Sequence, residues 1–504
     1  MTALPGDLVE AANRCLVVGF DGTTLPGELR RLADSGLGGV ILHTRNVAGR
    51  SQLRELTDEL RSLRPGLLVT VDQEGGGISH LARAGAPQTP GAWALGVADD
   101  TELTAAVAGA LARHLAECGV GVSFAPVADV HRLAANPIVR TRAFGADPGH
   151  AARHVTAWIE ATLAAGVAPC VKHFPGHGST AVDSHLSAAL DRREERVLRE
   201  IDLLPFQAAV AAGVPLVMTA HVVYPALDAA APATLSRRVV TDLLRGELGF
   251  QGVVVTDALE MKAIADGVGE AAGAVAAIAA GADQVIIARP DPELWLRCRD
   301  ALLDAMACDA LDPARVLDAA RRVDALAERF SQPPAAGRGP GLDSRLDSRL
   351  GSGLDSRLDP GSGDVGLLAA RRAVRWKPLP GPVLDPFVVD LHRPPHPALE
   401  WARTDLVTLL REAMPGTDGV VATRGPVDVA GILRRAQGRP LLIATEDPDL
   451  HPWQAAARTA LLTGRPDALL VATGMPDAET EAAGGLCAYG RGRANLRAVA
   501  EALL

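Results

Sequence analysis

The sequence has few cysteines, and its apolar runs are short. The six cysteines stand singly along the 504 residues, with no pair at the spacing of metal ligands. This pattern argues against a disulfide framework and favours reduced thiols in a cytoplasm. The first ten residues lack the basic region and apolar core of a secretory signal, and no later segment reaches transmembrane length without charge. We therefore expect a cytoplasmic protein that is not held in a membrane, with no metal ion and no cofactor.

Basic residues are outnumbered, and lysine is nearly absent. The chain carries 50 Lys and Arg against 60 Asp and Glu, a net charge of −10, without a basic stripe. This balance argues against nucleic acid or an anionic membrane as the partner and fits a small molecule or a glycan. Lysine occurs only at positions 172, 262 and 377. Because arginine cannot replace a compact ammonium in a tight site, we expect Lys172 to have a specific role. The sequence leaves the oligomeric state open.

Short apolar or β-branched runs alternate with segments that carry Ala, Leu, Arg and Glu at helical spacing. Such alternation predicts β-then-α units and a parallel sheet. The first 290 residues contain eight runs, the number that a (β/α)₈ TIM barrel requires. The runs cover residues 16–20, 39–42, 67–71, 121–127, 168–171, 215–219, 252–256 and 283–288, and helical segments cover 102–118, 151–165, 195–212 and 267–280.

The composition changes after the eighth unit. Residues 331–365 are rich in Pro, Gly, Ser, Asp and Arg and contain the repeat Leu-Asp-Ser-Arg three times, which predicts a mobile linker of low complexity. Apolar runs then return at 386–391, 419–423, 440–445 and 467–474, with a closing helix near 495–504. We therefore predict an α/β protein with three parts: a barrel over residues 1–330, the linker, and a smaller α/β sandwich over 366–504.

The stretch from Lys172 to His185 has a composition that stability alone does not explain. It holds three histidines, a lysine, an aspartate and two glycines within fourteen residues. Asp183 and His185 are two residues apart, so an extended segment places both side chains on one side. A carboxylate beside an imidazole can fix its tautomer and stabilise its charged form. The spacing therefore outlines an acid/base dyad.

Polar residues also follow several of the predicted strands. In a (β/α)₈ barrel the carboxyl ends of the strands form the face that carries the chemistry. A single acid at such a point could serve only to cap the next helix, but a ring of polar residues is harder to explain that way. The residues at these ends are Asp72, Asp129, Lys172, His173, His221 and Asp257.

These residues lie in segments that resemble glycoside hydrolase family 3 β-N-acetylglucosaminidases, the β-N-acetylhexosaminidases of the cell-wall-recycling type in their two-domain form. The segment Lys172-His173-Phe174-Pro175-Gly176-His177-Gly178 with Asp183-Ser184-His185 resembles the family signature. Further similar blocks follow the family order, and they lie at 71–76, 124–130, 142–145, 218–221, 232–236, 255–261 and, in the tail, 489–496.

The resemblance implies a retaining exo-β-N-acetylglucosaminidase that acts on muropeptides or chitooligosaccharides through a covalent glycosyl-enzyme. By this similarity Asp257 would be the nucleophile, and His185 with its partner Asp183 would be the acid/base dyad. The residues implied to bind the terminal sugar are Asp72, Arg142, Lys172, His173 and His221.

The sequence differs from the family pattern at a few positions. Gly77 and His80 stand where basic residues are common, Ser179 replaces a common Asp, and Ala258 replaces an Asp that often follows the nucleophile. These differences affect what can be held beyond the first sugar. His177 could support its loop or act in the site, and Asp129 could orient Lys172 or Arg142 or only cap a helix.

Two other functions remain open at this point. A phosphorylase would use phosphate in place of water, which a histidine acid/base permits because a neutral imidazole does not repel the anion as a carboxylate does. A sugar-binding homologue without catalysis is the other alternative, although all three implied reaction residues are present.

Overall fold

The computed structural model describes residues 5–184, 187, 189–333, 365–375, 377, 381–394 and 404–504. Two predictions therefore fall outside the described residues: His185, and nearly all of the linker predicted at 331–365. Among the described helices, none has the length and apolar composition needed to cross a membrane.

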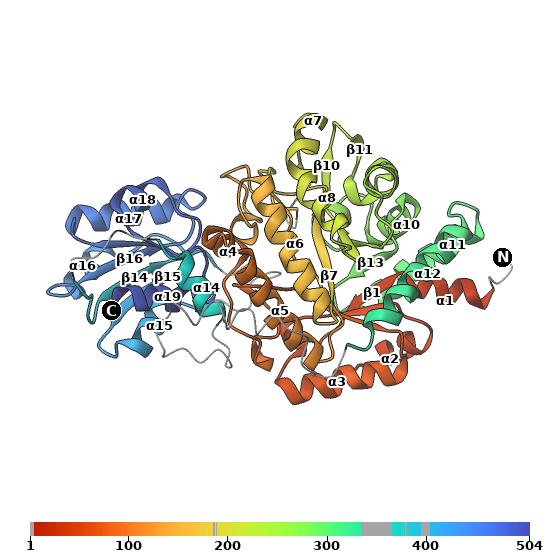
Figure 1. Ribbon diagram of the computed structural model, residues 1–504, viewed down its shortest axis with the longest axis horizontal. Coiled ribbons are helices and arrows are strands. Elements are labelled where there is room, and N and C mark those ends of the chain that lie inside the picture. The colour runs from red at the N-terminus through yellow and green to blue at the C-terminus, as the bar shows by residue number, and fades with distance from the viewer. Residues whose placement is uncertain are drawn as a thin grey trace.

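The N-terminal part of the chain is a closed barrel of eight parallel strands (Figure 1). Each strand pairs with the next one in the chain, and the last strand pairs with the first, Leu16 opposite Val285. All eight strands coincide with the predicted runs, so the predicted TIM barrel is confirmed. The strands are β1 (Leu16–Gly19), β2 (Gly39–Leu42), β3 (Leu68–Val71), β6 (Val122–Ser123), β7 (Ala168–Phe174), β9 (Leu216–Thr219), β12 (Val253–Ala258) and β13 (Gln284–Ile287).

The barrel interior is filled by aliphatic side chains, so it is a packed core. Val17, Ile41 and Leu68 are among the inward residues, while their neighbours in sequence pack outward against helices. Helix α12 (Pro313–Phe330) contributes to the interior cluster and covers the amino-terminal end of the strands. A side chain at Gly121, just before β6, would meet the carbonyl of Phe330. The opposite, carboxyl-terminal end of the barrel is therefore the one left for a site.

The outer layer consists of helices that follow the strands, several of them started by aspartate caps. Asp147 accepts from the amide of His150 at the start of α6, and Asp100 accepts from Leu103 at the start of α5. The helices of this part are α1 (Gly6–Arg14), α2 (Gly27–Asp34), α3 (Arg50–Leu63), α4 (Ala92–Ala98), α5 (Thr101–Glu117), α6 (Pro148–Ala164), α7 (Glu195–Val197), α8 (Leu203–Ala211), α9 (Lys262–Ala265), α10 (Glu270–Ala280) and α11 (Pro292–Ala307).

Several short strands, 3₁₀ turns and two π-helical segments complete the N-terminal part of the chain. They are the strands β4 (Gln73–Gly75), β5 (Ile78–Ser79), β8 (Ala189–Leu190), β10 (Val222–Tyr224) and β11 (Asp228–Pro232), the 3₁₀ turns η1 (Thr44–Asn46), η2 (Ala82–Ala84), η3 (Arg140–Arg142) and η5 (Ala233–Leu235), and the π-helical segments η4 (Leu198–Asp202) and η6 (Arg238–Glu247).

The C-terminal part is a second α/β layer structure, as predicted. Its five parallel strands are ordered β15-β14-β16-β17-β18. Separate apolar clusters fill the two faces, one with α14, α15 and α19 and the other with α16 and α17. The elements are α14 (Val365–Ala373), β14 (Phe387–Leu391), α15 (Leu406–Ala413), β15 (Asp418–Ala422), α16 (Val429–Arg435), β16 (Leu441–Thr445), α17 (Pro452–Gly464), β17 (Leu469–Ala472), α18 (Ala478–Ala483), β18 (Leu486–Cys487) and α19 (Arg493–Leu503).

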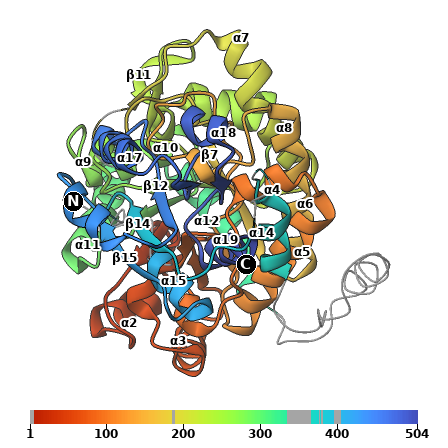
Figure 2. The ribbon, with the colours of Figure 1, turned by 90° about the vertical axis from the view of Figure 1, so that its left-hand side faces the viewer.

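The second sheet structure contacts the barrel through α14, which packs on α4 and α5 (Figures 1 and 2). Arg372 of α14 forms an ion pair with Asp100, and Arg375 donates to the carbonyl of Val97. A side chain at Gly366 would lie 2.0 Å from the carbonyl of Gln88, so glycine permits this close approach. The division of the chain at residues 330 and 366 stays a prediction.

Candidate functional site

The predicted strand-end residues meet at the carboxyl end of the barrel. Asp72 follows β3, Lys172 and His173 lie within β7, His221 follows β9, and Asp257 lies in β12. The closed order of the strands brings these ends into one ring, although the residues are separated by up to 185 positions in the chain. Such a convergence is typical of the active face of a (β/α)₈ barrel, as predicted from the sequence.

Lys172 is the centre of a buried ion-pair network. Its ammonium donates to Asp72 Oδ1 at 2.6 Å and lies 2.6 Å from Glu74 Oε1. Arg142 binds the same glutamate with two parallel hydrogen bonds, Nε to Oε2 at 2.9 Å and Nη2 to Oε1 at 2.8 Å. Lys172 is 2% exposed and Glu74 is 8% exposed. Lys172 and Arg142, the two cations predicted to bind the sugar, thus share one carboxylate, Glu74, which was not among the predicted site residues.

Electrostatics keep Glu74, Lys172 and Arg142 charged at neutral pH. Burial alone would raise the pKa of Glu74, but the adjacent Arg142 and Lys172 hold that pKa well below the ordinary value of a glutamate. Burial would lower the pKa of Lys172, but Asp72 and Glu74 raise it above its usual value. Because Asp72 keeps 23% of its side chain exposed, it can accept further hydrogen bonds from a ligand, whereas Glu74 supports the two cations from behind.

Asp129 orients His173, and this was not among the roles that the sequence left open for it. Its Oδ2 lies 2.7 Å from His173 Nδ1, and its Oδ1 accepts from the amides of His173 and His177. Burial acts to raise the pKa of Asp129, but His173 lowers it below the usual value. Since a carboxylate only accepts, His173 Nδ1 carries a proton. Its Nε2 is then the acceptor that faces Arg142 Nη2, 3.5 Å away.

The glycine-rich segment after β7 is bound closely to the loop that follows β6. Asn136 donates to the carbonyls of His177 and Thr180, and Arg132 N donates to the carbonyl of Gly178. A side chain at Gly178 would lie 1.8 Å from the carbonyl of Val130. Glycine at this position therefore permits two backbones to approach each other.

His177 supports the same segment through both ring nitrogens. Nδ1 lies 2.8 Å from Thr180 Oγ1, and Nε2 lies 2.9 Å from Ser184 Oγ. Burial lowers the pKa of His177 to about 4, so the ring is neutral at neutral pH. These contacts favour the loop-supporting role that the sequence left open for this histidine.

The segment that contains the predicted dyad contacts α9, the helix that follows Asp257. Asp183 is buried, and the carbonyl of Ser184 accepts from the amide of Ala263 at 3.4 Å. Ala263 belongs to α9, which begins five residues after Asp257. His185 itself lies outside the described residues. The structure therefore places the residue before His185 against α9, the helix that follows the predicted nucleophile in the chain.

Asp257 lies in β12, half-buried, with Oδ1 accepting from the amide of Ala258 at 2.8 Å. His221 follows β9, the strand next to β12, and both of its ring nitrogens contact protein groups. Its Nδ1 lies 2.7 Å from Thr234 Oγ1, and its Nε2 lies 3.0 Å from the carbonyl of Ala258. A carbonyl only accepts, so Nε2 is the protonated nitrogen. His221 therefore fixes the backbone beside Asp257, a contact that sequence spacing did not reveal.

The positions that differ from the family pattern also have visible contacts. His80 is buried with its ring edge-on to His43, and its Nδ1 lies 3.1 Å from Thr44 Oγ1. Burial lowers the pKa of His80 to about 4, so this position carries no cation at neutral pH. Gly77 lines a cavity between the barrel and the second sheet.

This cavity borders the ion-pair network. Its lining includes Glu74 and Arg142 from the barrel and Arg393, Glu446 and Arg491 from the second part of the chain. Glu74 could have been found in the sequence, because it lies two residues after Asp72 and an extended segment turns both side chains to one side. The C-terminal residues gave no such signal.

The chain is similar to proteins of one enzyme family. The family described as "Glycosyl hydrolase family 3 N terminal domain" matches residues 26–326. A beta-hexosaminidase of Xylella fastidiosa (strain M23) is 41% identical over 284 residues, which cover 55% of this chain and 84% of that protein. A beta-hexosaminidase of Alkalilimnicola ehrlichii is 40% identical over 280 residues, which cover 54% and 80%. The solved glycoside hydrolase family 3 β-N-acetylglucosaminidase from Paenibacillus sp. str. FPU-7 is 31% identical, with a TM-score of 0.86 over 99% of this chain and 97% of that one.

Proposed function

Because the chain belongs to glycoside hydrolase family 3, it is a glycoside hydrolase, and we propose that it is a retaining exo-β-N-acetylglucosaminidase. The substrate class is a small carbohydrate with a terminal β-linked N-acetylglucosamine. The similar proteins of this kind, one of which aligns along nearly the full chain, support this assignment.

In the proposed mechanism Asp257 attacks the anomeric carbon. A glycosyl-enzyme ester forms while the bond to the leaving oxygen breaks, and water then releases the sugar with its original configuration. His185 donates a proton to the leaving oxygen and later accepts one from the attacking water, with Asp183 stabilising the charged imidazole. The observation that carries the proposal is the contact between Ser184 and Ala263, because it joins the dyad segment to α9, the helix that begins five residues after Asp257.

The ion-pair network would hold the sugar. Asp72 is partly exposed and is held in place by Lys172, so its carboxylate can accept from sugar hydroxyls. His173 and Arg142 present an acceptor and a donor beside each other. Since His221 uses both ring nitrogens on protein groups, we assign it the positioning of the Asp257 strand end in place of direct sugar binding.

A kinetic and product analysis tests the mechanism. We expect the purified protein to hydrolyse an aryl N-acetyl-β-glucosaminide, with the β-anomer of N-acetylglucosamine as the first product seen by NMR. Asp257→Ala should lose almost all activity, and azide should restore turnover to an α-glycosyl azide, because the small anion attacks from the vacated face. Asp266→Ala, an exposed aspartate beyond α9, is the matched control and should retain activity.

Two outcomes would contradict parts of this proposal. A sugar 1-phosphate as the main product in phosphate buffer would replace the hydrolase by a phosphorylase. Full activity of Asp257→Ala would remove Asp257 from the reaction. Activity that resists both Asp257→Ala and His185→Ala would contradict the whole site assignment.

The natural substrate is proposed as a muropeptide fragment or a chitooligosaccharide. His80 is neutral at neutral pH and Gly77 has no side chain, so fewer cations are available beyond the first sugar than the family pattern has. We also propose a cytoplasmic location. The six cysteines are all free thiols, and five of them are buried, which fits a reducing compartment. Cell fractionation and a comparison of turnover on both substrate classes would test these two points.

A further inference from the structure

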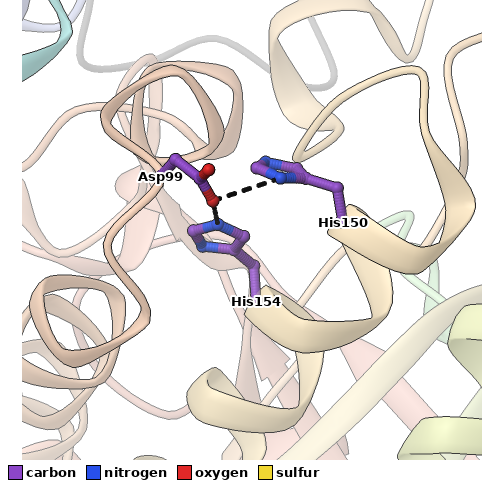
Figure 3. A group of neighbouring side chains, drawn as sticks. All are labelled: Asp99, His150 and His154. Carbon is purple, nitrogen blue, oxygen red and sulfur yellow. Dashed lines mark ion pairs between the residues drawn. The ribbon is translucent and has the colours of Figure 1, made fainter.

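A cluster of metal-ligand side chains lies on the outer helices of the barrel, apart from the strand ends (Figure 3). Asp99 ends α4, and His150 and His154 are one turn apart on α6. Asp99 Oδ1 is 3.3 Å from His150 Nδ1 and 3.7 Å from His154 Nε2. All three ligand atoms lie within 4.8 Å of one another. Figure 3 shows both imidazoles turned toward the one carboxylate.

His154 has a buried ring nitrogen without a hydrogen-bond partner. The residue is 0% exposed, its ring stacks on Phe144, and Nε2 hydrogen-bonds to no group in the part of the chain that the structure describes. Its other nitrogen, Nδ1, lies 2.8 Å from Thr104 Oγ1, whose hydroxyl donates to the carbonyl of Asp100. That hydroxyl therefore accepts from Nδ1–H, and Nε2 carries a lone pair.

In this tautomer two hydrogen-bond acceptors, His154 Nε2 and the Asp99 carboxylate, face each other. With the lone pair on Nε2, no proton separates this nitrogen from Asp99 Oδ1, which lies 3.7 Å away. Leaving a buried acceptor unsatisfied is costly, and a positive ion between the two groups would satisfy both. One nitrogen of Arg153 already approaches the exposed side of the cluster, 3.3 Å from Asp99 Oδ1 and 3.2 Å from His150 Nδ1. The cluster thus has the electrostatic character of a cation site.

We propose that Asp99, His150 and His154 bind one divalent transition-metal ion, with Zn²⁺ as the reference case. Two imidazoles and one carboxylate suit Zn²⁺ and leave a fourth position for water, whereas Mg²⁺ prefers oxygen ligands. Ligand atoms about 2 Å from a tetrahedral zinc lie roughly 3.3 Å apart. The distances at Asp99 Oδ1 are close to this value, and its side chain is 62% exposed and able to adjust.

The position of the cluster indicates a structural role for the ion. It would tie the end of α4 to α6, and Asp100, the next residue, forms the ion pair with Arg372 of α14. The ion would therefore stiffen the barrel surface on which the second sheet structure rests. Arg153 is 57% exposed, so it can turn away when the metal enters.

Calorimetric titration of the full chain with Zn²⁺, with Mg²⁺ for comparison, tests the proposal. We expect one Zn²⁺ per chain, a higher melting temperature with Zn²⁺, and no matching effect of Mg²⁺. Asp99→Asn and His150→Gln should each weaken Zn²⁺ binding at least about tenfold, since even supporting residues of metal sites contribute that much. Asn tolerates the left-handed backbone of Asp99, φ 49°, so this variant should fold.

Two variants serve as controls with opposite or no expected effect. Arg153→Ala should strengthen Zn²⁺ binding about two- to fivefold, because it removes a competing surface charge. Asp58→Asn, which removes an exposed partner of Arg54 on α3, should leave binding unchanged. A wild-type chain that binds no Zn²⁺, equal binding of Mg²⁺, or Zn²⁺ binding that survives both ligand variants would overturn the proposal.

Discussion

Replacing Glu74 by glutamine should damage the site more than any single sugar-facing substitution outside the reacting groups. Glu74 is the shared partner of Lys172 and Arg142, with N–O distances of 2.6 to 2.9 Å. Glutamine keeps the shape but not the charge, and its amide nitrogen would face one of two donors. Both cations would then lie buried with a single carboxylate, Asp72, bound only to Lys172.

The magnitude follows from burial. Removing one partner of a buried ion pair typically costs about 3–5 kcal/mol, because the remaining charge keeps its desolvation penalty. If about 3 kcal/mol of this appears in the transition state, kcat/KM falls by roughly a hundredfold. Because the pKa of Glu74 is well below its ordinary value, the loss should be similar at every pH at which the enzyme is folded and active.

The assay compares kcat/KM for an aryl N-acetyl-β-glucosaminide in wild type, Glu74→Gln and a control. Glu28→Gln is the control, since Glu28 pairs with Arg31 at the surface, where such pairs contribute about 0–1 kcal/mol. Melting temperatures separate loss of fold from loss of function. A Glu74→Gln variant that keeps kcat/KM within about threefold of wild type at an unchanged melting temperature would refute this prediction.

Two further predictions concern stability. Burial lowers the pKa of five histidines to about 4, below their ordinary value of 6.5. Between pH 6.5 and pH 4 the unfolded chain therefore binds more protons than the folded chain. The free energy of unfolding should fall as the pH falls through this range. The slope should approach about 1.4 kcal/mol per pH unit for each histidine; a melting temperature that stays constant from pH 7.5 to 5, measured with a chelator present, would contradict this. Gly178→Ala should lower the free energy of unfolding by about 1–3 kcal/mol, because the added methyl group would push the segment away from Val130, and it should lower the activity as well. Gly49→Ala is the control, since the space around Gly49 is open, and it should change neither the stability nor the activity. Thermal denaturation and turnover assays measure the two properties. The five histidines are His80, His114, His131, His154 and His177.

The barrel could be predicted from the sequence because each strand is a separate short apolar run. Every strand carries residues that are buried on both faces, so the runs stand out against the helices between them. In the second part, four of five strands were predicted, and β18 was missed. Its two residues, Leu486 and Cys487, are too few to form a recognisable pattern.

Partners across the chain were harder to predict than the residues themselves. The ring of strand ends follows from topology, so Asp72, Lys172 and Asp257 could be placed on one face in advance. Which carboxylate holds which base depends on side-chain packing, and Asp129 proved to hold His173. The Asp99 cluster escaped notice for the same reason, since 51 positions separate Asp99 from His150 and only the packing of α4 on α6 joins them.

The turn η3 links the two halves of the chain within three residues. Arg142 reaches inward to Glu74, while Arg140 reaches outward to Asp447 and Asp449 beside the second sheet, at 2.9 and 3.1 Å. Arg140 has a left-handed backbone, φ 37°, which costs a non-glycine residue about 1–2 kcal/mol unless its side chain is held. The barrel is therefore not a self-contained module. In an excised barrel Arg140 would lose both of these aspartates, and we expect the turn to relax. The barrel alone should therefore be less active than the full chain, although the two parts are separate in architecture.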